Sequence, residues 1–184
     1  MKNILLLLLL ISSTYASDAK IYFGSSVGFL NETIDDTDIS ASAPTAKIKI
    51  GYGVREAYAI EFSLDYTKNE SRMYSTAGND YDGDKYGFNV DFVKGFDYDI
   101  YVLPYLKAGF GAGIFKINRK IQDKLHYGSY NIGFGTFLPV NEHFDFELGY
   151  EYRWTSYEAV DIISEQVRHS SKVNIAYLGF NIRY

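Results

Sequence analysis

The sequence contains no cysteine, and what else it lacks is also informative. Without cysteine, a disulfide framework and thiol catalysis are both excluded. The 184 residues suit one domain, only 3 are proline, and few segments look helical. The formal net charge of -5 leaves no basic excess for nucleic acid. The sequence therefore predicts neither a disulfide scaffold, a cysteine enzyme nor a nucleic-acid-binding protein.

The only long apolar run is at the N-terminus. Lys2 precedes the eight apolar residues Ile4–Ile11, and small residues follow around Ala16. This is the pattern of a secretory signal peptide cleaved after Ala16. A transmembrane helix is the alternative, but it needs roughly 20 apolar residues. We expect residues 1–16 to be a signal peptide and residues 17–184 to be one exported domain.

The exported part alternates apolar and polar residues, which indicates β-strands with two unlike faces. Every second residue back from the C-terminus is apolar: Tyr184, Ile182, Phe180 and Leu178. Eight stretches show this pattern. Their expected bounds are 19–30, 46–54, 58–67, 85–93, 100–115, 130–138, 144–155 and 172–184.

The links between these stretches alternate in length. Residues 55–57, 94–99 and 139–143 are short turns, whereas 31–45, 68–84, 116–129 and 156–171 are long. Short turns on one side and long loops on the other are typical of outer-membrane barrels. The sequence predicts an all-β fold, an eight-stranded antiparallel up-and-down transmembrane β-barrel with both ends on the short-turn side.

Two observations orient the faces. Twelve strand glycines share the polar face, where they would make room for long neighbours inside a narrow barrel. The apolar face carries residues too bulky for that interior, and its aromatics cluster near strand ends as in interfacial girdles. The expected girdles are Tyr58, Phe92, Phe144 and Tyr184 at the turn end, and Phe29, Tyr66, Tyr86, Tyr130 and Trp154 at the loop end.

The inward face then collects charges of both signs. They could form a charged conduit, but a salt-bridged plug is favoured because mixed charges pair in a narrow space. The basic excess would be met by trapped water, counter-ions or acidic loop residues folding in. The expected inward charges are Lys20, Lys47, Lys49, Arg55, Lys85, Lys107, Arg153, Arg183, Glu61, Asp65, Asp91, Glu147 and Glu151.

The last six residues place Gly179, Ile182 and Tyr184 in the arrangement of a bacterial outer-membrane targeting signal. With the signal peptide and the eight strands, the chain resembles the small OmpA/OmpX-type barrel family over its exported length. The family usually ends in Phe, so Tyr184 is a departure. The resemblance implies residence in the Gram-negative outer membrane, contact with its lipid, assembly by the barrel assembly machinery and a structural or adhesin-like role through the loops, where a host or surface ligand would bind.

Chemical motifs are weak. His169 and Ser171 form a His-x-Ser pair that slightly resembles outer-membrane lipid A deacylases, but Lys172 stands where those enzymes have Asn. The alternating carboxylates Asp80, Asp82 and Asp84 lack the glycine position and the glutamate of a calcium loop. We predict no catalytic, metal or cofactor site; a narrow channel or a lipid A hydrolase are the alternatives.

The long links differ in charge. The first two are acidic, with Glu32 and Asp35 in the first, and the third is basic. Lipopolysaccharide carries phosphates at that height of the outer leaflet, so basic side chains there could bind it; the competing interpretation is a hydrated loop. The basic residues of the third link are Lys116, Arg119, Lys120 and Lys124.

Overall fold

The computed structural model describes residues 19–35, 40–68, 83–117, 123–162, 165–167 and 169–184. The signal-peptide prediction therefore lies outside the described residues. Among those described, no helix is long and apolar enough to span a membrane. The strands are β1 (Lys20–Ile34), β2 (Ser40–Gly53), β3 (Tyr58–Thr67), β4 (Lys85–Gly95), β5 (Leu103–Lys116), β6 (Lys124–Pro139), β7 (Phe144–Tyr157), β8 (Val160–Ile162), β9 (Glu165–Val167) and β10 (Ser170–Arg183).

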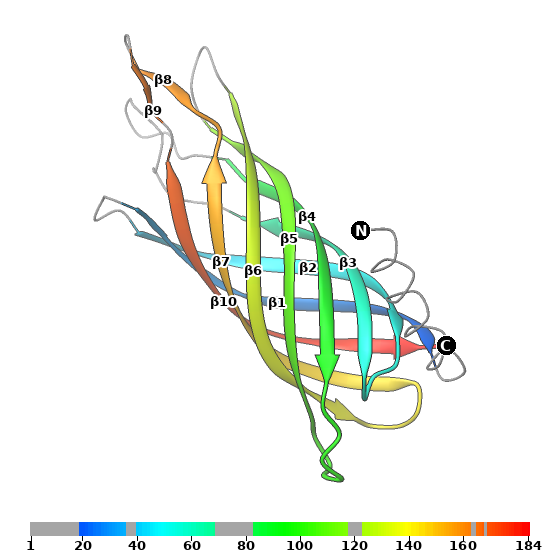
Figure 1. Cartoon of the computed structure of the whole chain (residues 1–184). Helices are drawn as coiled ribbons and strands as arrows, with labels where there is room; N and C mark the ends of the chain where they lie inside the picture. Colours follow the sequence, from blue (N-terminus) through cyan, green and yellow to red (C-terminus); the bar gives the residue numbers. More distant parts are fainter. Residues whose placement is uncertain (1–18, 36–39, 69–82, 118–122, 163–164, 168) are drawn as a thin grey trace, which may run out of the picture.

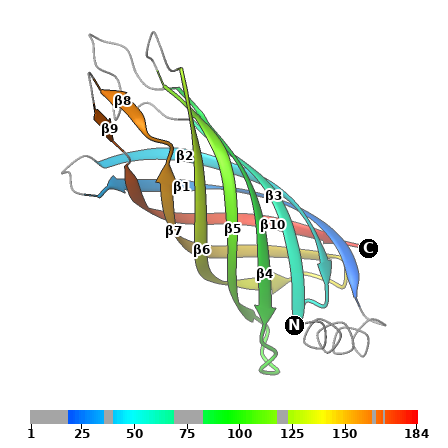
Figure 2. The same cartoon turned by 45° about the horizontal axis from the view of Figure 1, so that its top comes forward.

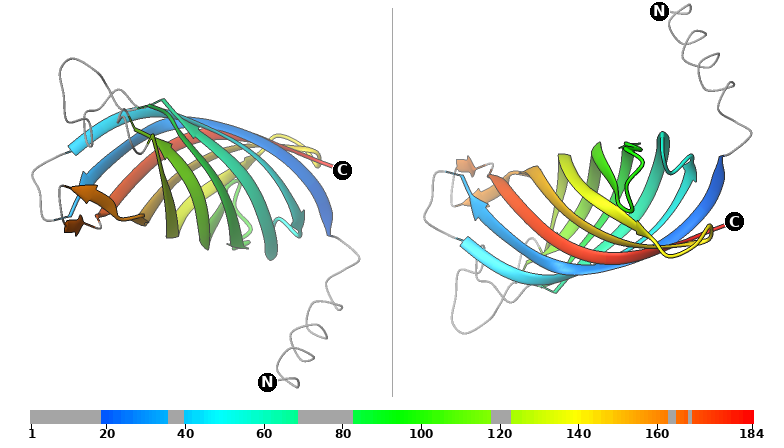
Figure 3. Two further views of the ribbon diagram at one scale, coloured as in Figure 1. Left: turned by 90° about the horizontal axis from the view of Figure 1, so that it is seen from above. Right: turned by 90° about the horizontal axis from the view of Figure 1, so that it is seen from below.

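Eight of these strands form a closed antiparallel barrel in the order β1-β10-β7-β6-β5-β4-β3-β2, which confirms the predicted fold class. Figure 1 shows them running side by side from the end where β8 and β9 project to the end where the C-terminus lies. The connection between β4 and β5 extends from the latter end (Figure 2). Seen from above and below, the strands follow one curved, strongly tilted wall (Figure 3). Closure leaves no unpaired sheet edge, which is what a bilayer requires.

The last strand closes on the first. β10 pairs with β1 from Tyr22↔Arg183 to Ile34↔Ser171. The Tyr184 amide donates to the Ile21 carbonyl at 2.9 Å, and the Tyr184 ring meets Phe23 edge-on. The C-terminal residues are therefore part of the wall, as their alternation indicates.

The outward face is apolar and its aromatics pair across strands. At the turn end Tyr58 lies against Phe92, with ring centroids 5.4 Å apart. At the loop end Tyr66 lies against Tyr86 at 5.4 Å, and another pair joins β6 and β7. Such contacts stabilise adjacent strands by about 0.2–1 kcal/mol each. Both predicted girdles contain such pairs.

Several strands are longer at the loop end than expected. Residues 31–34 continue β1, 40–45 begin β2 and 124–129 begin β6, although we expected all of them in loops. Above the apolar band the outward face carries polar residues such as Asn31, while the inward face carries Leu30, Ile34 and Leu125. The alternation continues with its polarity reversed, so a search for apolar residues on the outward face misses these segments. The hairpin β8–β9 in the fourth long link was also not predicted.

The interior holds large aromatic side chains as well as charges, which corrects the expectation that bulky residues lie only outside. Tyr22 and Tyr105 are buried near the turn end. They fit because inward glycines face them: a Cβ on Gly51 would lie 2.2 Å from Tyr22 Cζ, and one on Gly149 would lie 2.5 Å from Tyr105 Oη. Pro104 is the second residue of β5, near the turn-side rim, which agrees with the expected rim position.

Candidate functional site: the charged lumen and the loop-side rim

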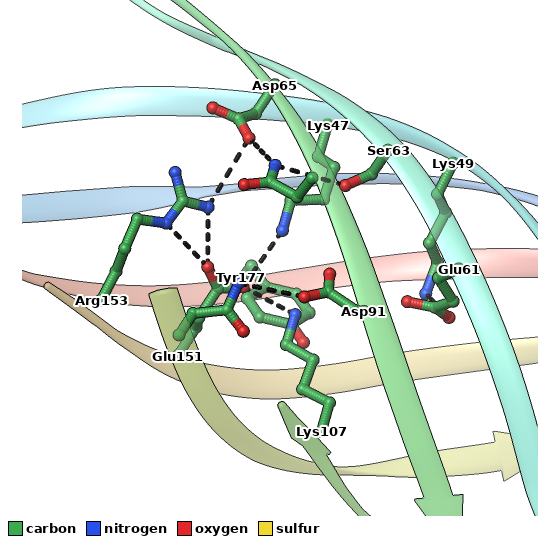
Figure 4. Close-up of polar contacts among 12 residues, drawn as sticks. Lys47, Lys49, Glu61, Ser63, Asp65, Asp91, Lys107, Glu151, Arg153 and Tyr177 are labelled. Carbon is green, nitrogen blue, oxygen red and sulfur yellow. Dashed lines mark hydrogen bonds and ion pairs between the residues drawn. The ribbon is translucent and has the colours of Figure 1, made fainter. Parts of the chain in front are cut away.

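Glu151 on β7 is the central residue of a cluster of charged side chains in the lumen. Its carboxylate lies 3.1 Å from Lys47 Nζ and 2.6 Å from Lys107 Nζ. It also accepts hydrogen bonds from Arg153 Nε at 3.1 Å and Nη2 at 2.7 Å. Figure 4 shows these three cations, which come from β2, β5 and β7, converging on the one carboxylate. Arg153 Nη2 also lies 3.5 Å from Asp65 Oδ1 on β3, so the cluster extends across the lumen from β7 to β3.

A second cluster lies one step nearer the turn end. Lys49 Nζ bridges Glu61 at 2.9 Å and Glu147 at 2.6 Å. Both carboxylates also accept phenol hydrogen bonds, Glu61 from Tyr22 at 2.7 Å and Glu147 from Tyr105 at 2.8 Å. Paired ions with further hydrogen bonds satisfy the condition for burying charge. The charged groups here are all paired, whereas the amide oxygen of Asn181, which donates to Glu147 from its nitrogen, has no hydrogen-bond partner among the described residues.

The turn-side end of the lumen is closed by Asp145. Its two oxygens accept hydrogen bonds from Arg55 Nη1 at 2.6 Å and Arg183 Nε at 2.7 Å. The Arg183 guanidinium stacks over the Tyr22 ring, 4.5 Å from its centroid. A buried carboxylate between two guanidiniums thus fixes the turn after β2 against β7 and β10.

Glu32 occupies the loop-side end. It accepts hydrogen bonds from Lys85, from the Tyr157 hydroxyl, and from Ser171 Oγ at 2.6 Å. An apolar layer that contains Phe115 and Tyr157 lies around it. We expected Glu32 on an acidic surface loop, and this is wrong: the side chain is buried inside the extended β1.

Among the residues that the structure describes, the lumen charges balance in sign. We expected a basic excess; the structure adds Glu32 and Asp145 to the acidic side and leaves Lys20 half-buried at the first residue of β1. Asp145 could have been found, because it shares the parity of Glu147. The seven basic groups are Lys47, Lys49, Arg55, Lys85, Lys107, Arg153 and Arg183, and the seven acidic groups are Glu32, Glu61, Asp65, Asp91, Asp145, Glu147 and Glu151.

Little space remains between these side chains. One cavity of about 10 Å³ lies beside Lys47, Asp65 and Arg153, and another of about 10 Å³ lies beside Glu32 and Lys85. Each is about the smallest volume that holds one water molecule. Neither cavity is large enough for a hydrated ion or a solute.

In the described part of the loop-side rim, two solvent-exposed polar contacts join neighbouring strands. His126 Nδ1 lies 3.0 Å from Glu158, and its hydrogen bond lowers the pKa of the Glu158 carboxyl. Asp35 accepts hydrogen bonds from Lys172 and Ser170, and these lower its pKa. The contacts tie neighbouring strand ends together above the apolar band.

The predicted lipopolysaccharide residues are only partly described. Lys116 ends β5 and Lys124 begins β6; the two are directly opposite and face outward. Lys116 Nζ lies 5.0 Å from the centroid of the Tyr86 ring. Arg119 and Lys120 lie outside the described residues.

The weaker sequence motifs have ordinary surroundings. Ser171 is buried with its hydroxyl donated to Glu32, and Asp84 accepts a hydrogen bond from Tyr66 at 2.9 Å. Asp80 and Asp82 lie outside the described residues. No group of three or more metal-ligating side chains occurs within the described ranges.

Comparison with known proteins agrees with this geometry. The neisserial surface protein A (NspA) structure is similar, with TM-score 0.67 and 15% identity, over 90% of this chain and 99% of that one. Ail, the attachment invasion locus protein of Yersinia pestis, has TM-score 0.54 and 18% identity over 90% and 97%. The N-terminal barrel domain of Pseudomonas aeruginosa OprF has TM-score 0.51 and 16% identity over 88% and 97%.

At these identities the three similar structures establish the fold alone. No curated protein sequence matches the chain. The sequence model of the outer membrane protein beta-barrel domain matches residues 4–183, which is nearly the whole chain. The chain therefore belongs to the outer membrane protein β-barrel family.

Proposed function

We propose that this protein is a closed-lumen barrel of the Gram-negative outer membrane with a structural or adhesin-like role through its long loops, and without catalysis. The observation that carries the proposal is the balanced ion-pair network that fills the lumen. An eight-stranded barrel is just wide enough for its own side chains, so the wall acts as a rigid support. Loops on such a support are where binding residues usually lie.

A narrow channel is the main alternative, and planar-bilayer recording separates the two. The purified protein should show no steady, large, reproducible conductance. A stable open channel that a bulky substitution at Gly109 or Gly111 removes would overturn the closed lumen and favour a porin. Those positions are suitable because a Cβ on Gly109 would already lie 2.1 Å from Asp91 Oδ1, and one on Gly111 lies 2.2 Å from Asn89 Oδ1.

A second part of the proposal is that Lys116 and Lys124 bind lipopolysaccharide phosphate. Like charges directly opposite on a sheet destabilise it, and an anion between the two ammonium groups would relieve this repulsion. The paired variant Lys116→Gln with Lys124→Gln should weaken binding to lipopolysaccharide. Lys20→Gln, at the other end of the barrel, is the matched control. Equal binding by both variants and wild type contradicts the assignment.

The loop ligand requires a direct screen. Because Ail is described as an attachment invasion locus protein, adhesion is the interaction to test first. Refolded protein should bind host-cell surfaces or extracellular matrix, and grafting unrelated sequences into the long loops should abolish the binding while the barrel still folds. If neither host surfaces nor lipopolysaccharide bind, a purely structural role is favoured.

The hydrolase alternative has a separate test. Ser171 is buried and donates its hydroxyl to Glu32, which is already paired with Lys85, so the hydroxyl is not accessible to a lipid substrate. Cells that make wild type and Ser171→Ala should therefore contain identical lipid A. Deacylated lipid A that is present with wild type and absent with the variant would establish the hydrolase instead.

A further inference from the structure

A groove of about 440 Å³ crosses the outward face of β4, β5, β6 and β7. It exists because Ala108 stands between larger residues: its direct neighbours on the adjacent strands are Phe92 and Ile132. Leu106 and Phe134 continue the walls toward the turn end. The groove is thus a slot over the small side chain of Ala108, between aromatic and larger aliphatic neighbours.

A lysine ammonium group lies at one end of the slot. Lys94 lines its turn-side end and is directly opposite Tyr58 on β3 and Leu106 on β5. Its ammonium lies 4.1 Å from the centroid of the Tyr58 ring and 5.5 Å from that of Phe96. Among the described residues these aromatic faces are its partners, and it forms no ion pair with any of them. A lysine whose stem lies along an apolar wall and whose head reaches the headgroup level is typical of a membrane interface.

The position of Lys94 along the barrel axis determines which leaflet of the membrane the groove faces. Lys94 lies near the end of β4 that meets the short connection to β5, the side where both described ends of the barrel also lie. In outer-membrane barrels the short turns face the periplasm. The slot therefore opens into the inner leaflet, which consists of glycerophospholipids, with the ammonium at the level of their phosphates.

We propose that this groove is a specific site for one anionic glycerophospholipid of the inner leaflet. The lipid phosphate binds Lys94 Nζ between the rings of Tyr58 and Phe96, and one acyl chain lies in the slot above Ala108. The slot is continuous with the lipid-facing wall, so lipid is the occupant that the surroundings supply. A lone ammonium favours a headgroup without a cation of its own, as in phosphatidylglycerol. The proposal is independent of what the loops bind.

Native mass spectrometry of the refolded, full exported chain tests this site. The protein is incubated in micelles with equal amounts of phosphatidylglycerol and phosphatidylcholine, and the lipid that stays bound is counted. Wild type should retain one phosphatidylglycerol in preference to phosphatidylcholine. Lys94→Gln should lower that preference about fivefold, the factor expected for one lysine beside a phospholipid phosphate. Lys94→Arg should preserve it.

A matched pair of variants tests the slot. Ala108→Phe fills the groove and should abolish retention of both lipids. Ala112→Phe adds the same ring to the same outward face of β5, four residues away and outside the groove lining, and should leave retention unchanged. Each variant is first shown to fold by its heat-modifiable mobility in gels.

Three results would overturn the site. Retention by Ala108→Phe at the wild-type level rejects the slot, and an unchanged lipid preference in Lys94→Gln rejects the ammonium. A dimer that Ala108→Phe alone dissociates would show that a second copy of the chain, instead of lipid, covers the groove.

Discussion

Replacing Glu151 by glutamine is the sharpest test of the lumen network. The substitution keeps the size of the side chain and removes one negative charge from a site with no solvent exposure. Lys47, Lys107 and Arg153 would then share a neutral amide, although each lies within 3.1 Å of the present carboxylate. Breaking a buried ion pair typically costs about 3–5 kcal/mol because the remaining charge stays buried. We expect the free energy of unfolding to fall by that amount.

Urea unfolding of the refolded barrel in lipid vesicles measures this loss. Trp154 is the only tryptophan and stacks on Tyr130 in the wall, with ring centroids 5.0 Å apart, so its fluorescence reports loss of the barrel. Adding Lys107→Met to Glu151→Gln removes one of the stranded cations. The pair should recover roughly 0.5–3 kcal/mol relative to the sum of the single variants, which is the usual coupling between contacting residues.

The control for this experiment lies on the same chain segment. Glu158 is half-exposed and contacts only the rim residue His126 among the described side chains. Glu158→Gln should change the free energy of unfolding far less than Glu151→Gln does, because its contact with His126 is exposed to solvent. If Glu151→Gln costs less than about 1 kcal/mol, the value of a surface ion pair, then the lumen is hydrated and the argument for a dry, closed plug fails.

Three further predictions concern the ends and rims of the barrel. Deleting Tyr184 should lower the amount of folded protein in the outer membrane, since the terminal residue completes the predicted assembly signal; unchanged levels in membrane fractions would contradict this. An epitope inserted near Asp80 should be labelled on intact cells and one near Glu56 should not, whereas labelling near Glu56 would invert the topology. Glu158 should titrate below its ordinary pKa of 4.5 by NMR, and His126→Ala should raise that pKa again. The stabilising contribution of Glu158 is then present above its ordinary pKa and is lost as the pH falls through the lowered value; an unchanged titration in the variant would reject the contact.

The fold could be predicted because lipid imposes one rule on every strand. An outward face against hydrocarbon must be apolar, and the inward face of so narrow a tube must carry residues that pair or are small. In β7 this places Phe146 and Leu148 outward and Glu147 and Gly149 inward, as the structure has them. The alternating link lengths then determine the topology.

The rule fails where the wall leaves the lipid. Around Glu32 and Leu125 the exposed outward residues are polar and the buried inward ones are mostly apolar, as in a soluble barrel, and we infer that this part of the wall stands in water. A search for apolar residues on the outward face places segments of the opposite polarity in loops, and it therefore leaves Glu32 out of the lumen. The apolar layer around Ile34 and Phe115 was missed for the same reason.

Partner choice in the lumen could not be predicted either. Parity places Lys49 and Glu147 on the inward face, but which cation meets which carboxylate depends on strand tilt and on large side chains between them. The hydroxyls of Tyr105 and Tyr177 form a hydrogen bond across the lumen, with their oxygens 2.7 Å apart. In the sequence, only their position in the alternation distinguishes these two residues from the tyrosines that face lipid. The Lys94 groove depends on one alanine and its cross-strand neighbours, so it cannot be predicted without knowing the register in which the strands pair.

The ion pairs between β2 and β7 have a consequence for how the barrel opens and closes. Lys47–Glu151 and Lys49–Glu147 join strands that lie on either side of the seam where β1 meets β10, and Arg55–Asp145 does so from the turn after β2. These contacts depend on the meeting of the first and last strands, because in the unclosed sheet β2 and β7 are separated by the four strands β3 to β6. Peeling β1 away from β10 would pull all three apart and admit water to the charges together. Seam closure and dehydration of the interior are therefore one cooperative event, and lateral release of the terminal strands is resisted from inside the tube as well as by their own backbone ladder.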